Sequence, residues 1–81
     1  MTEKEIREKL IDILNSLSWD YTINANKDTT IREVIVDSLD EVEFEMKLEK
    51  TFSIYAKDVR DFINSDTTVE DIVKYVKERI N

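Results

Sequence analysis

The sequence predicts an all-α fold: a small four-helix bundle of three long helices and one short helix, with a long loop between the first two long helices. Three segments repeat apolar residues at helical spacing, and no segment sustains the alternation of a half-buried strand. A polar stretch from residue 18 to about residue 35 interrupts the periodicity. These features favour helices packed on helices over a fold that contains a sheet.

The first long helix is expected to begin close to the N-terminus. Thr2 and Glu5 have the three-residue spacing of a capping box. The apolar residues that then recur on one helical face are Ile6, Leu10, Ile13, Leu14 and Leu17. We expect this face to enter the core.

The stretch from residue 18 to about residue 35 is predicted to be a loop with one turn of helix near residues 30–34. A loop this long is uncommon in a compact domain unless its own apolar residues hold it in place. The residues expected to do so are Trp19, Tyr21, Ile23 and Ile31. The chain has neither Gly nor Pro, and Asn is the residue that next best tolerates left-handed backbone. The expected turn residues are therefore Asn24, Asn26, Asn64 and Ser65. We find no internal repeat.

The second long helix is expected to start with Asp37 or Ser38 as its N-cap and to end near Thr51. Ser38 and Glu41 also fit a capping box. Winding this helix at about 100° per residue gathers Phe44, Leu48 and Phe52 within an arc of about 80°. This arc predicts a face that packs in the core.

The same helix carries a second apolar stripe, centred about 150° from the first and formed by Leu39, Val42 and Met46. Charged residues flank this second stripe, with Asp40, Glu43, Lys47 and Lys50 on one side and Glu45 and Glu49 on the other. An exposed apolar strip with a charged rim is typical of a transient docking surface. The alternative is a central helix buried on both sides, which the many carboxylates disfavour because a buried unpaired charge is costly.

A short helix and a last long helix complete the predicted bundle. Asp58 is expected to cap the short helix, which places Val59, Phe62 and Ile63 on one face. Thr67 with Glu70, or Thr68 with Asp71, is expected to open the last helix. The apolar face of that helix contains Val69, Ile72, Val73, Val76 and Ile80.

The length and charge of the chain restrict its class and its partners. Its 81 residues allow one small domain, which we expect to span residues 1–81. Its formal charge of −7 repels nucleic acid and anionic membranes, so we expect basic protein partners, and we expect a monomer. No secretion signal is apparent, and no apolar run approaches the roughly 20 residues of a membrane span. We expect a cytoplasmic protein without membrane contact.

The chemistry open to the chain is limited by its composition. It contains no His and no Cys, which excludes a Ser-His triad and thiol catalysis but leaves a Ser-Lys arrangement open. The carboxylates near Ser38 form no recognisable cation loop, and we expect no metal site. A hydroxyl at a helix N-terminus can instead carry a phosphate ester, because free N–H groups and a partial positive charge lie there. Taken alone, Ser38 equally fits an ordinary N-cap.

The run from residue 37 to residue 54 resembles the acyl carrier protein signature. It reads Asp-Ser-Leu-Asp-Glu-Val-Glu-Phe-Glu-Met-Lys-Leu-Glu-Lys-Thr-Phe-Ser-Ile. The signature has Asp-Ser-Leu, then alternating acidic and apolar residues, then Leu-Glu and a Phe. Residues 68–76, Thr-Val-Glu-Asp-Ile-Val-Lys-Tyr-Val, are similar to the closing helix of the family. The resemblance covers the chain from about Val34 to its end.

This resemblance implies a non-catalytic carrier whose prosthetic group is 4′-phosphopantetheine, attached to Ser38 from coenzyme A by a phosphopantetheinyl transferase. The thiol of that group would carry acyl thioesters to fatty-acid or related biosynthetic enzymes. The family docks its second long helix on basic patches of acyl-transferring and acyl-modifying enzymes. The matching positions here are Asp37, Leu39, Asp40, Val42, Glu43, Met46 and Glu49. The bundle interior of the family can shelter an acyl chain, here between Phe44, Leu48, Phe62 and other core residues.

Other functions stay open at this point. One is a specialised carrier of polyketide, secondary-metabolite or aminoacyl groups. Another is an acidic helical adaptor that binds a basic partner and carries no prosthetic group. The last is a small enzyme that uses Ser38 or the carboxylates.

Overall fold

The computed structural model describes residues 1–17, 25–35 and 37–80. Their helices are α1 (Glu3–Ser16), α2 (Ile31–Val34), α3 (Ser38–Phe52), α4 (Ala56–Phe62) and α5 (Val69–Ile80). These residues form no strand, and a single isolated bridge joins Thr30 to Thr68. The predicted all-α fold is confirmed, and α2 is the helical turn expected within the long loop. Trp19, Tyr21, Ile23 and Asn24 lie outside the described residues.

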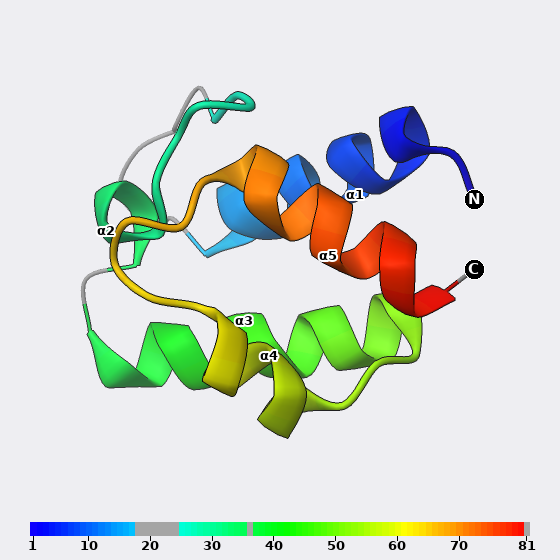
Figure 1. Cartoon of the computed structure of the whole chain (residues 1–81). Coiled ribbons are helices and arrows are strands. Elements are labelled where there is room, and N and C mark those ends of the chain that lie inside the picture. Colours follow the sequence, from blue (N-terminus) through cyan, green and yellow to red (C-terminus); the bar gives the residue numbers. More distant parts are fainter. Residues whose placement is uncertain (18–24, 36, 81) are drawn as a thin grey trace.

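The helices pack around one hydrophobic core. α1 packs against α5 and α3, and α3 also packs against α4. Figure 1 shows α1 and α5 lying above α3, with α4 in front of it. The predicted core faces of α1, α3 and α5 are buried, and Leu10, Phe44 and Val73 are completely so. Burial of these apolar side chains is the main favourable contribution to folding.

Three helices, α1, α3 and α5, begin after a side chain that accepts a hydrogen bond from a free backbone N–H group of the first turn. Thr2 forms the predicted capping box with Glu5 at the start of α1. Of the two alternatives for α5, the structure selects Thr68, whose hydroxyl accepts a hydrogen bond from the Asp71 amide at 3.2 Å. The short helix differs from its prediction, because α4 begins at Ala56 after Tyr55, so Asp58 lies within its first turn. An acidic residue is favourable there as well, since the helix N-terminus is partially positive.

Two short segments of the chain form the same turn. Residues 26–30 and 64–68 both read Asn-x-Asp-Thr-Thr, a repeat that the sequence analysis missed. In each, the Asn side-chain oxygen accepts from the amide two residues on, at 2.9 and 2.8 Å. In each, the hydroxyl of the first Thr accepts a hydrogen bond from the backbone N–H of the Asn, at 2.9 and 3.0 Å. Asn26 and Asn64 therefore make these turns through their side chains, which removes the need for glycine.

The two turns also bind each other reciprocally. The Ile31 amide donates to the Thr67 carbonyl and the Val69 amide donates to the Thr29 carbonyl, both at 2.9 Å. These bonds place the first residue of α2 beside the first residue of α5. The position of α2 beside the start of α3 therefore depends on the turn that opens α5 (Figure 1).

The left-handed backbone of the described residues lies at Ser53, and not at the described candidates Asn26, Asn64 and Ser65. Among the described residues Ser53 alone has a positive φ, of 58°. It follows the last residue of α3, and its amide closes the helix by donating to the Glu49 carbonyl at 2.8 Å. A residue with a Cβ is disfavoured in this conformation.

Ser53→Gly is expected to raise the free energy of unfolding by about 0.5 to 1 kcal/mol, because Gly adopts left-handed backbone without a steric cost. Thr51→Gly, an exposed change inside the last turn of α3, is the matched control. It is expected to lower the same free energy by about 0.5 kcal/mol. Urea unfolding of both variants gives the comparison, and a loss of stability in Ser53→Gly would contradict the assignment.

A paired charge joins the first helix to the last. Arg7 donates from Nε and Nη2 to the two carboxylate oxygens of Glu70, at 3.0 and 2.9 Å. This hydrogen bonding lowers the pKa of Glu70 below its ordinary value of 4.5. A depressed carboxyl pKa contributes stability above the unfolded-state pKa, and the contribution is lost as the pH falls.

Glu70→Gln is therefore expected to be less stable than the original protein at pH 7, with the difference shrinking as the pH falls below about 4.5. Thermal unfolding of both proteins between pH 7 and pH 3 measures the two curves. Curves that stay parallel across that range would show that the ion pair contributes nothing.

Candidate functional site

The start of α3 is defined by Asp37. Its carboxylate accepts a hydrogen bond from the Asp40 amide at 2.9 Å, and its backbone is extended, as an N-cap requires. Of the two predicted caps, Asp37 is therefore the correct one. The expected capping box between Ser38 and Glu41 is wrong, because Ser38 is the first residue inside the helix.

Ser38 is consequently free of a capping role. It is exposed, and its hydroxyl has no hydrogen-bond partner among the described residues. It lies at the N-terminus of a 15-residue helix, where the first backbone N–H groups have no partner within the helix. Such an end favours an anion, although the neighbouring Asp37 and Asp40 oppose one. The Ser38 residue is therefore accessible from solvent.

The second stripe of α3 is exposed, as expected. Leu39, Val42 and Met46 are 79%, 44% and 61% exposed. They border a shallow surface hollow of about 530 Å³ whose other lining residues are Glu43, Lys47, Glu49 and Lys50. Every lining residue belongs to α3, so the hollow is an open strip along one helix and not a cavity inside the bundle. The alternative of a central helix buried on both sides is wrong.

The structure brings together five of the seven predicted docking residues in this hollow. Asp37 and Asp40 lie outside it, at the start of α3. The charges along the strip are uneven. The charged residues in its first half, up to Glu43, are all acidic, whereas its second half also contains the basic residues Lys47 and Lys50. Lys47 is already engaged, because its ammonium donates to the Ser16 hydroxyl at 2.9 Å and lies 3.8 Å from Glu43.

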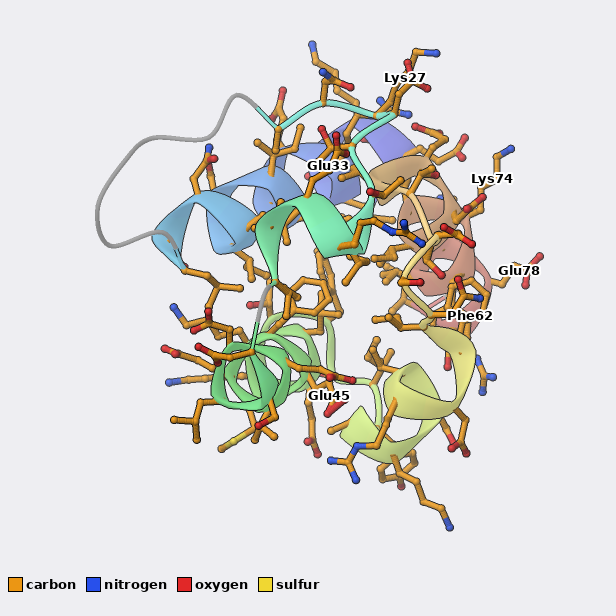
Figure 2. The ribbon with its side chains drawn as sticks, turned by 90° about the vertical axis from the view of Figure 1, so that its left-hand side faces the viewer. Lys27, Glu33, Glu45, Phe62, Lys74 and Glu78 are labelled. Atoms are coloured by element: carbon orange, nitrogen blue, oxygen red, sulfur yellow. The ribbon has the colours of Figure 1, made fainter. Side chains whose placement is uncertain are left out.

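Glu45 is not part of the charged rim, contrary to the prediction. It is 2% exposed, and the Nε of Arg60 on α4 donates to its two carboxylate oxygens, at 3.2 and 3.1 Å. Figure 2 shows its side chain directed from α3 toward α4. Sequence reasoning missed this pair, but a signal was present. At about 100° per residue Glu45 lies only about 20° from Phe52 of the core face.

Phe62 is also placed differently from the prediction. It is 38% exposed at the end of α4, where its ring stacks on Tyr75 of α5 at a centroid distance of 4.4 Å (Figure 2). Burial raises the pKa of Tyr75, and Arg79 lies over the same ring at 4.8 Å. Phe62 therefore covers the outside of α5 and does not line the interior, whereas Phe44 and Leu48 are interior residues.

The described residues contain neither a membrane-spanning helix nor a cluster of metal ligands. No helix among them is long and apolar enough to cross a membrane. No three of their acidic side chains are grouped in a way that could hold a metal ion.

Comparison with known proteins gives the family. The chain is 34% identical to the acyl carrier proteins of Rickettsia massiliae and Rickettsia typhi, over 96% of its own length and 90% of theirs. The chain belongs to the acyl carrier protein family. The acyl carrier protein of Rickettsia canadensis is 33% identical over the same shares. No family model and no solved structure gives a significant match.

Acyl carrier proteins are carriers and not catalysts, so the expectation of a non-catalytic protein is confirmed by membership of the family. The resemblance of residues 37–54 to the acyl carrier protein signature is confirmed in the same way, since the alignment covers nearly the whole chain. The exposed Ser38 and the open strip along α3 are the features of this acyl carrier protein from which a function can be derived.

Proposed function

We propose that this protein carries acyl groups as thioesters on 4′-phosphopantetheine attached to the Ser38 hydroxyl. The observation that carries the proposal is the placement of Ser38 one residue after the N-cap. Because Asp37 performs the capping, the Ser38 hydroxyl bonds to none of the described residues, and Ser38 is exposed to solvent. The sequence has no Cys, so the thiol that carries the acyl group must come from a prosthetic group.

The attachment reaction needs little from this chain. A phosphopantetheinyl transferase would supply coenzyme A, and the Ser38 oxygen would attack the phosphorus next to the pantetheine. The new P–O bond forms as the pyrophosphate bond of coenzyme A breaks, the hydroxyl proton passes to a base of the transferase, and adenosine bisphosphate leaves. Residues of α3 hold the hydroxyl in place, and the free N–H groups of its first turn favour the resulting phosphodiester.

The open strip along α3 would dock the enzymes that load, modify and receive the acyl group. Leu39, Val42 and Met46 offer apolar contact beside the attachment site. The acidic residues Asp37, Asp40, Glu43 and Glu49 would steer basic patches of those enzymes into register. We propose that the carrier is one domain over residues 1–81, acts in the cytoplasm as a monomer, and serves fatty-acid synthesis or a related pathway.

Incubation with coenzyme A and a promiscuous phosphopantetheinyl transferase is expected to add one phosphopantetheine, detected by intact mass. Ser38→Ala should remain folded and gain nothing. Ser65→Ala, which removes another exposed serine, should be modified like the original protein. An original protein that no transferase modifies, including one from its own source, would favour the unmodified adaptor instead.

Glu43→Lys is expected to lower the kcat/KM of that modification by about threefold to tenfold at low ionic strength, because it weakens steering toward a basic patch. The difference should shrink as salt screens the charges. Glu8→Lys makes the same change of charge at an exposed position of α1. Its effect on kcat/KM should be much smaller. Equal effects of the two substitutions would show that net charge, and not the strip on α3, governs docking.

A further inference from the structure

We propose that the cargo of this carrier is a short acyl group that stays at the mouth of the bundle, because an ion pair between α3 and α4 excludes a long alkyl chain. The inference rests on the proposed attachment at Ser38. It concerns what the arm carries and where the cargo lies once the arm is in place.

Besides the open strip along α3, a second depression lies close to the attachment site. It has a volume of about 180 Å³, and its wall includes Glu41, which lies one turn along α3 from Ser38. The remaining wall comes from α2, from the residue that follows it and from the segment between α4 and α5, namely Ile31, Arg32, Ile35, Ile63, Asn64 and Ser65. Glu41 places this depression next to the start of α3, where the arm is attached.

A chain that passes deeper must separate α3 from α4. The next residue of α3 on that side is Glu45, one turn after Glu41, and it is the buried carboxylate held by Arg60. An alkyl chain in this position would either replace the guanidinium or lie against the charged pair. The first arrangement leaves the buried Glu45 carboxylate without a partner, and the second places apolar atoms against charged ones and excludes water from them, so both are unfavourable.

Apolar side chains around the ion pair are buried as well. Phe44, Leu48 and Val59, which surround the α3–α4 contact, are at most 1% exposed. Phe62, which the family resemblance placed inside, is packed on the outside of Tyr75. Protein interiors are close-packed, so a long chain would have to displace these side chains as well as the ion pair.

The depression itself suits a small and partly polar group. Its apolar surface comes from isoleucines, and its rim carries the Glu41 carboxylate and the Asn64 amide. The Arg32 guanidinium on the same rim is bound to Asp66 at 2.7 Å and to Ser65 at 3.1 Å. A group of a few carbons with a hydroxyl, amide or amine can contact both kinds of surface.

The test compares a short and a long cargo on the intact protein. A promiscuous transferase loads Ser38 from acetyl-coenzyme A or from dodecanoyl-coenzyme A, and intact mass verifies each product. Methyl NMR then reports on Leu48 and Val59 inside the α3–α4 contact and on Ile35 and Ile63 at the depression. We expect the methyl signals of Leu48 and Val59 to be the same in the two loaded proteins.

A paired variant tests whether the ion pair is the barrier. Glu45→Val with Arg60→Met replaces the pair by apolar side chains, a change that buried pairs often tolerate. With dodecanoyl cargo this variant should show shifted Leu48 and Val59 signals. Arg7→Met with Glu70→Val removes a different interhelical pair, between α1 and α5, and should behave like the original protein.

The outcomes separate this inference from the proposed function. Failure of any loading counts against phosphopantetheine on Ser38. Shifted Leu48 and Val59 signals in the original protein loaded with dodecanoyl overturn the inference while the proposed function stands. That comparison decides the matter even if the paired variant does not fold, which its circular dichroism would reveal.

Discussion

The hydrogen bond from the Asp40 amide to the Asp37 carboxylate sets the start of α3, and the candidate site depends on it. With Asp37 as the cap, Ser38 becomes the first helical residue and its side chain is released from the backbone. Had Ser38 been the cap, its hydroxyl would have been engaged with the amide groups of the first turn. The rotation of the helix follows instead from the burial of its apolar core face, which includes Phe44 and Leu48.

That rotation gives α3 three different sides. One packs Phe44 and Leu48 into the core, and another exposes the apolar strip from Leu39 to Met46. The third faces α4 and buries Glu45 against Arg60. One helix at the surface of a small bundle thus serves as a core element, as a proposed surface for partners and as one wall of the depression near Ser38. The reciprocal turns at residues 26–30 and 64–68 position α2 as the opposite wall.

Much of this arrangement could be predicted from the sequence, since helical periodicity depends on local spacing. The core face and the exposed stripe of α3, and the capping box at Thr2, follow from such patterns. The Glu45–Arg60 pair did not, because it joins two helices whose relative rotation no local pattern specifies. Phe62 was misplaced for a similar reason. An aromatic residue at core spacing on a short helix can be satisfied by stacking on a neighbouring ring instead of by burial.

The central claim is that Ser38 carries a phosphopantetheine arm in the living cell. The most direct measurement is the intact mass of the protein isolated from its native source, followed by fragmentation of the peptide that contains Ser38. The account predicts a mass above that of the sequence by one phosphopantetheine, with or without a short acyl group, located on Ser38. Native protein that has only the mass of its sequence under all growth conditions would contradict it.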